Sequence, residues 1–130
     1  MTRINCVPPS ELTTKHLMAE YYELPRVFVY AQRAAARGWD AKDSPRYYKL
    51  GKGHVKFFAI RLAYLSQRYS DIYQELISRG VKATRPSLMS SELIKFSKTQ
   101  SWMWLSWAPR PEDQELNRAR LRERSPGEYA

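Results

Sequence analysis

Apolar residues between His54 and Arg79 recur every three to four positions, which is the spacing of one face of an α-helix. They are Val55, Phe58, Leu62, Leu65, Tyr69, Ile72, Leu76 and Ile77. Gly80 follows directly, and glycine commonly ends a helix because it adopts a positive φ without strain. This pattern predicts one long helix at the centre of the core, so the chain is expected to be mainly α-helical.

Other segments of the chain carry helix signals as well. A helical pattern runs from Ser10, the predicted N-cap, to about Glu23. Pro25 cannot continue that helix without a kink, but it suits the first turn of a second helix that is predicted to end at Gly38. A last helix follows Pro111, with acidic residues in its first turn and arginines toward its end, as the helix dipole favours.

The stretches between these helices show no sustained periodicity. Residues 39–53 carry turn signals throughout and are predicted to be a loop. Residues 81–108 are irregular, with a short helix around 91–97 as one interpretation. The predicted fold class is all-α: a compact single domain over residues 1–130, with about three main helices and long irregular connections. A chain of 130 residues, 43% of them hydrophobic, can bury a core of this kind.

The cysteine and histidine content argues against several classes of protein. Cys6 is the single cysteine, so neither an internal disulfide nor a cysteine-based metal cluster can form. With His16 and His54 as the two histidines, no metal site and no cofactor are expected. No apolar run approaches the roughly 18 residues of a membrane span, and the first residues lack a signal-peptide pattern. The sequence predicts a protein of the reducing cytoplasm with no membrane partner.

The charge balance is strongly basic. Twenty-two Lys and Arg residues oppose 13 Asp and Glu residues, which gives a formal net charge of +9. Such a balance favours a polyanionic partner, and nucleic acid is the leading candidate. Ribosomal, membrane-surface and simply soluble proteins also have basic compositions, so charge by itself leaves these classes open.

The start of the chain offers an unusual nucleophile. Thr2 is small enough for an aminopeptidase to remove Met1, which would leave a free threonine α-amine. An α-amine titrates near 8 and a lysine near 10.4, so roughly two hundred times more of the α-amine is the free base at neutral pH. Arg3 would lower the pKa of this amine further by charge repulsion and could hold a phosphate beside it. The plain alternative is a terminus without any chemical role.

Glu23 is the charged residue whose position needs an explanation. It falls at the predicted end of the first helix, where a carboxylate opposes the negative end of the dipole. A salt bridge to Arg26 is the ordinary interpretation. A catalytic carboxylate beside a cationic imine is the functional one, and composition does not decide between them.

Two blocks of sequence resemble one family of DNA repair enzymes. The first is Met1-Thr2-Arg3-Ile4-Asn5, Ser10-Glu11-Leu12, His16-Leu17-Met18-Ala19-Glu20-Tyr21 and Glu23-Leu24-Pro25-Arg26-Val27-Phe28. The second is Gly51, Gly53-His54-Val55, Phe57-Phe58 and Arg79-Gly80. Together they resemble the phage and algal-virus pyrimidine-dimer DNA glycosylases, the endonuclease V repair family. The similarity is dense over residues 1–28, moderate over 51–80 and thin beyond.

The resemblance implies a compact all-α enzyme that bends DNA and extrudes a base. It implies that the α-amine of Thr2 attacks the sugar C1′ to form an imine, and that Glu23 stabilises the cationic sugar and promotes β-elimination. The residues that it places around the DNA are Arg3, His16, Arg26, Arg120 and Arg124.

The sequence departs from the family at three places. Tyr22 stands where the family commonly has Arg, and its ring could stack on a base or pack in the core. Lys15 stands where the family commonly has Gln. Residues 125–130 follow the last helix without the family's aromatic-rich tail, and the tryptophans of residues 102–107 could supply aromatic surface in its place or pack in the core.

These observations lead to one main hypothesis and two alternatives. The main hypothesis is a monomeric glycosylase and abasic-site lyase that acts on double-stranded DNA at cyclobutane pyrimidine dimers, in the host cytoplasm if the protein is viral. One alternative keeps the chemistry and changes the damaged or modified base. The other is a non-catalytic basic DNA-binding protein on the same scaffold.

Overall fold

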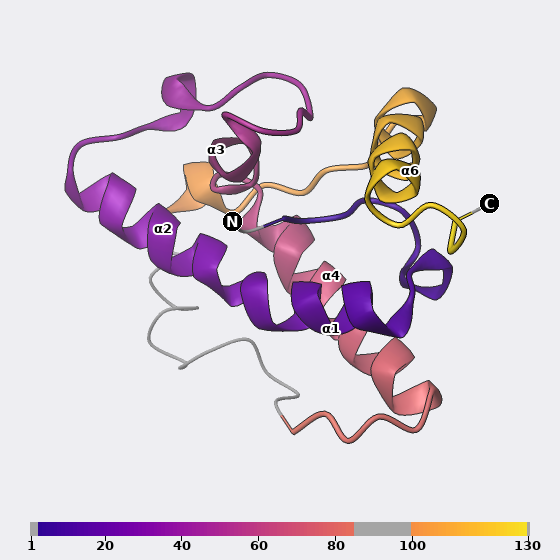
Figure 1. The fold of residues 1–130 in the computed structure, drawn as a ribbon. Helices are drawn as coiled ribbons and strands as arrows, with labels where there is room; N and C mark the ends of the chain where they lie inside the picture. Colours follow the sequence, from indigo (N-terminus) through magenta and orange to yellow (C-terminus); the bar gives the residue numbers. More distant parts are fainter. Residues whose placement is uncertain (1–2, 85–99, 130) are drawn as a thin grey trace.

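The computed structural model describes residues 3–84 and 100–129. Their regular secondary structure is helical (Figure 1). The α-helices are α1 (Thr14–Glu23), α2 (Pro25–Ala36), α3 (His54–Phe58), α4 (Leu62–Ser78) and α6 (Pro111–Arg124). Short 3-10 turns occur at Pro9–Glu11, Ala41–Asp43 and Ser101–Met103. No strand is found in the described part, where an isolated β-bridge pairs Arg61 with Trp104. The all-α prediction is confirmed.

α1 and α2 form one long, kinked rod across the molecule (Figure 1). Leu24 joins them in a helical conformation, and Pro25 takes the first position of α2, where its missing N–H costs nothing. The predicted end of α2 is confirmed. Gly38 has φ +89° and donates its N–H to Ala35 O at 3.0 Å, while Trp39 N–H bonds Ala34 O at 3.0 Å, the two bonds of a Schellman motif.

The predicted N-cap of the first helix is wrong. Ser10 lies inside the 3-10 turn, and α1 begins three residues later than expected because Leu12 and Thr13 are extended. The hydroxyl of Thr13 accepts the N–H of His16 at 3.2 Å and is the N-cap in its place.

The long central helix predicted over His54–Arg79 is divided into α3 and α4. Arg61 leaves the helical conformation, with φ −114° and ψ 47°, and bridges to Trp104. Leu105 N–H then bonds Ile60 O at 3.1 Å. The Arg61 guanidinium donates to Phe57 O at 2.7 Å, so the carbonyl freed by the break is satisfied. Hydrogen bonds to a distant segment therefore override a helical period that continues unbroken through the sequence.

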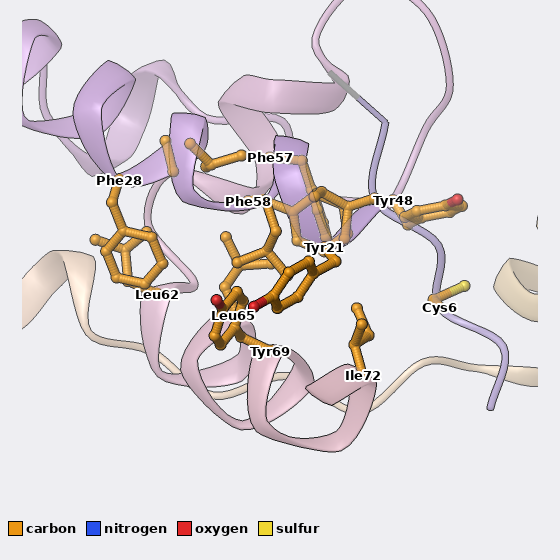
Figure 2. Packing of buried hydrophobic residues seen from close by; sticks show 14 of the residues in the cluster. Cys6, Tyr21, Phe28, Tyr48, Phe57, Phe58, Leu62, Leu65, Tyr69 and Ile72 are labelled. Carbon is orange, nitrogen blue, oxygen red and sulfur yellow. The ribbon is translucent and has the colours of Figure 1, made fainter. Parts of the chain in front are cut away.

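Aromatic and aliphatic side chains from every α-helix meet in one core (Figure 2). Tyr21 of α1 stacks on Tyr69 of α4 with ring centroids 5.4 Å apart. Trp107 packs at 5.1 Å from Phe57, and Trp102 at 5.9 Å from Trp39. The tryptophans of residues 102–107 thus pack against the core, as one of the two interpretations expected. The short helix considered around 91–97 lies outside the described residues. No helix among the described residues is long and apolar enough to cross a bilayer.

An extended segment, residues 3–7, runs between the helices, and no partner strand for it occurs within residues 3–84 and 100–129 (Figure 1). His54, at the start of α3, is one of its anchors: Nε2 accepts the N–H of Ile4 at 2.9 Å, and Nδ1 contacts Lys49 O at 2.8 Å. An acceptor at Nε2 and a donor at Nδ1 define a neutral imidazole. Burial of His54, the main cause, lowers its pKa from 6.5 and favours the same neutral form.

We predict that the protein loses stability as the pH falls below about 6.5, through His54. Below that pH the unfolded chain binds a proton that the folded histidine resists, so stability that is fully present above pH 6.5 declines toward the lower pKa of the folded state. Urea unfolding at pH 5 to 7.5 measures the slope.

The matched variant for this prediction is His54→Phe, which keeps a buried ring and cannot titrate. It should unfold more easily at pH 7, by about 1–3 kcal/mol for the unpaired Ile4 N–H. Its stability should also depend less on pH than that of the parent protein. An identical pH slope in the two proteins would contradict the assignment.

Candidate active site

Glu23 and the first described residues of the chain meet at one point. The backbone N–H of Arg3 donates to Glu23 Oε1 at 3.1 Å, which holds the last side chain of α1 against the extended segment. Thr2 lies outside the described residues. Thr2 is joined to Arg3 by one peptide bond. The carboxylate of Glu23 is therefore hydrogen-bonded to the residue that directly follows the predicted nucleophile.

The predicted salt bridge between Glu23 and Arg26 is not found among the described residues. Arg26 is exposed on α2, where it lines a separate groove with Tyr30 and Arg33. The ordinary explanation for Glu23 is therefore wrong, and its carboxylate remains directed at the N-terminal segment.

A pocket of about 200 Å³ opens beside this contact. Its walls come from the N-terminal segment, α1 and α6, and its lining residues are Arg3, Asn5, His16, Ala19, Glu20, Glu23, Leu121 and Arg124. Four residues predicted from the sequence thus share one pocket: Arg3, His16, Glu23 and Arg124. Tyr22 and Arg26 do not line it. The ring of Tyr22 makes an edge-type contact with Tyr21, and the residue is 50% exposed. The interpretation that Tyr22 packs in the core is therefore wrong.

The pocket holds a second carboxylate, Glu20, which has a different role. Glu20 is buried and forms a two-pronged ion pair with Arg68 of α4, at 2.8 Å to Nε and 3.1 Å to Nη2. It also accepts Asn5 Nδ2 at 2.9 Å. Both oxygens of Glu20 are occupied by structural partners, so Glu23 is the carboxylate of this pocket that is available to a substrate. Neither Glu20 nor Arg68 was identified from the sequence, which gives no sign that α1 and α4 bring them together.

Two arginines of α6, Arg120 and Arg124, lie close enough to Arg3 to affect its pKa. Partial burial lowers the pKa of Arg3, and repulsion from Arg124 and then Arg120 lowers it further. Arg120 does not line the pocket, but it lies close enough to Arg3 for this repulsion, and its Nε is buried without a hydrogen-bond partner in the described structure. An anion bound beside Arg3 would relieve its repulsion by Arg124 and Arg120, and a phosphate fits this requirement.

Tyr129 of the C-terminal segment contacts His16, a residue of the pocket lining, and was not identified from the sequence. Its hydroxyl lies 2.6 Å from His16 Nδ1 and accepts Thr13 N–H at 3.0 Å. Its ring stacks on His16 at 5.5 Å with an interplanar angle of 8°. Burial lowers the pKa of His16, and nearby cations add to this effect, so the neutral imidazole is favoured. The segment predicted to lack an aromatic tail therefore still delivers one aromatic ring to the site.

The described residues contain no group of three His, Cys, Asp or Glu side chains that could hold a metal ion. The site consists instead of one available carboxylate, a stacked histidine and a cluster of arginines around the N-terminal segment. This arrangement can bind a phosphodiester and place a negative charge beside a cationic sugar.

Comparison with known protein families agrees with this geometry. A family model described as pyrimidine dimer DNA glycosylase matches residues 1–89. The matched stretch contains Arg3, His16 and Glu23 and supplies two of the three walls of the pocket, while α6 with Arg124 lies beyond it. Because the match covers more than half of the chain, including the N-terminal segment and α1, the protein belongs to the pyrimidine dimer DNA glycosylase family of DNA repair enzymes.

Proposed function

We propose that the protein excises the base at a cyclobutane pyrimidine dimer in duplex DNA and then nicks the strand, with the α-amine of Thr2 as nucleophile and Glu23 as its electrostatic partner. The observation that carries the proposal is the hydrogen bond from Arg3 N–H to Glu23 Oε1, at 3.1 Å. It keeps the available carboxylate of the pocket beside the residue that follows Thr2.

The first step forms a bond between the free-base amine and C1′ of the damaged nucleotide. The glycosidic bond breaks, and the base takes the bonding electrons and a proton, while the cyclobutane ring keeps it joined to the neighbouring pyrimidine. Opening of the sugar ring then moves the C1′–O4′ electron pair to O4′, which takes up a proton, and leaves a cationic imine between C1′ and the amine nitrogen.

The second step is β-elimination. Loss of a proton from C2′ sends electrons toward C3′ and expels the 3′ phosphate, because the imine accepts the developing charge at C1′. Water then hydrolyses the imine and releases the amine. Glu23 stabilises each cationic state, and a preorganised charge is most effective in a confined site such as this pocket.

The arginines provide the binding energy for the substrate. We assign Arg3, Arg120 and Arg124 to the phosphates at the lesion, because an anion relieves the repulsion that Arg124 and Arg120 exert on Arg3. Arg26 and Tyr22, both exposed near the junction of α1 and α2, extend the contact to flanking DNA. We also assign His16 to a phosphate contact through Nε2, since Nδ1 is engaged by the Tyr129 hydroxyl at 2.6 Å.

Blocking the terminal amine should abolish strand cleavage. An acetylated terminus, or a retained Met1 verified by mass spectrometry, removes the nucleophile that the proposal requires. Borohydride should then trap no covalent adduct with lesion-bearing duplex, while DNA affinity stays within about threefold, because the arginines carry it. A protein that keeps Met1 and cleaves at the full rate would refute the role of Thr2. A processed protein that binds DNA without a trapped adduct would favour the non-catalytic alternative.

Replacing Glu23 with Gln should separate catalysis from binding. Gln keeps the acceptor for Arg3 N–H and removes the charge, so the free energy of unfolding should change by about 1 kcal/mol or less. Single-turnover cleavage should slow by at least about a hundredfold, the scale of losing one preorganised electrostatic group, and binding should be equal or tighter. Glu115→Gln is the matched control, because it removes the same charge from an exposed ion pair on α6. Equal cleavage rates in the two variants would exclude Glu23 from the mechanism.

DNA affinity should depend steeply on salt. If about six phosphates are neutralised, a log–log plot of affinity against salt concentration has a slope near −5, and affinity falls about a thousandfold between 50 and 200 mM. Arg124→Ala should make the slope shallower by about one unit. Fluorescence anisotropy with lesion-bearing duplex measures both quantities. An affinity independent of salt would argue against phosphate binding by the arginine cluster.

A further inference from the structure

Asn117 is a polar side chain with no exposed surface in the middle of α6, and the mechanism proposed above does not use it. It lies beyond residues 1–89, the stretch that the family comparison covers. Burial of an amide is unfavourable unless its hydrogen bonds are satisfied, so the contacts of Asn117 identify what it holds in place.

Those contacts all lead to the N-terminal segment. The side-chain oxygen of Asn117 accepts Cys6 N–H at 2.7 Å and Val7 N–H at 3.3 Å. Its amide nitrogen donates to Asn5 Oδ1 at 2.8 Å, and Asn5 in turn donates to Glu20 at 2.9 Å. A segment without a partner strand needs side-chain acceptors for its buried amides, and Asn117 supplies the acceptor for two successive ones.

The same face of α6 carries the arginines of the site. Arg120 and Arg124 follow Asn117 by three and seven residues, which places the three side chains along one helical face. One end of residues 3–7 is thus fixed to α6 through Asn117, and the other end is fixed to α1 where Arg3 meets Glu23. Each residue of extended chain spans about 3.3 Å, so slippage of this segment by one residue would move the terminus by that distance.

We infer that Asn117 is a positioning residue: it locks the segment that carries the nucleophile to the helix that holds the lesion phosphates. The buried carboxamide of Asn117 then fixes the distance between amine and sugar together with Glu23 and His54, which hold Arg3 and Ile4. This inference rests on the proposed function, because it concerns the same amine and the same phosphates. Displacement of reacting groups by about 1 Å can slow a reaction on the order of a hundredfold, which makes a fixed link valuable here.

The test compares Asn117→Leu with Asp113→Asn. Leucine fills a similar volume and removes all three hydrogen bonds to residues 5–7. Asp113 is also buried on α6, where it caps the helix through Arg110, so its substitution destabilises the same helix without removing a side-chain contact to the N-terminal segment. Melting temperatures establish that both variants are folded at the assay temperature. If Asn117→Leu does not fold, Asn117→Ser takes its place in every comparison.

The first measurement is the single-turnover rate of borohydride trapping on saturating duplex with an abasic site, together with Kd for the same duplex. Asn117→Leu should be trapped at least about tenfold more slowly, with Kd within about threefold. Asp113→Asn should be trapped within about twofold of the parent rate. Equal trapping rates in the two variants would overturn the inference and reduce Asn117 to a stabilising residue.

The second measurement is a double-mutant cycle with Arg124→Ala, read out as the trapping rate. Substitutions of two residues that act through the same contact have non-additive effects, whereas the effects of independent substitutions add. Arg124→Ala should slow the parent protein by about tenfold and the Asn117→Leu variant by only about twofold. Full additivity would contradict the link between segment and helix.

Amide hydrogen exchange at Cys6 and Val7 makes failure of this inference distinguishable from failure of the proposed function. Both amides should lose protection in Asn117→Leu and keep it in Asp113→Asn, whatever the enzyme does to DNA. Retained protection in Asn117→Leu would overturn the inference even if the parent protein is an active lyase. An inactive parent protein with lost protection would overturn the proposed chemistry and leave the anchoring role standing.

Discussion

The structure depends on how an extended segment is held inside a helical protein. Residues 3–7 pair with no strand in the part of the chain that the structure describes, and side chains satisfy their buried N–H groups instead. Glu23 accepts the N–H of Arg3, and His54 accepts the N–H of Ile4. Asn117 accepts the N–H groups of Cys6 and Val7. These acceptors come from three helices, α1, α3 and α6, and the segment in turn ties those helices together. Residues 4–7 are therefore buried as part of the core.

This arrangement explains why one pocket contains carboxylates with different roles. Glu20 and Glu23 are neighbours on α1, but Glu20 is neutralised by Arg68 and anchors the segment through Asn5. Within the described residues, Glu23 accepts one backbone N–H, that of Arg3, and lies close enough to the Arg3 guanidinium to affect its pKa. The buried ion pair keeps the segment in place, and the less engaged carboxylate remains available for chemistry.

The site joins a part of the chain that the family comparison covers with a part that it does not. α1 and the N-terminal segment lie within residues 1–89, whereas Asn117, Arg124 and Tyr129 lie beyond them. The second part still reaches the pocket, since Arg124 lines it and Tyr129 stacks on His16. Glu23 thus lies on the matched side of the pocket, whereas Arg124 and Asn117, to which we assign phosphate binding and positioning, lie on α6.

The sequence by itself determined the helical class and the end of α2 at Gly38. Through its motifs it also indicated the family and Glu23 as the candidate catalytic carboxylate. These features depend on residues close together in the chain, where helical period, proline and glycine act locally. Only the tertiary structure decided the break at Arg61, the pairing of Glu20 with Arg68 and the contact of Tyr129 with His16. Each of these depends on hydrogen bonds or stacking between residues more than 40 positions apart, and no local pattern specifies which distant partner will satisfy a buried polar group.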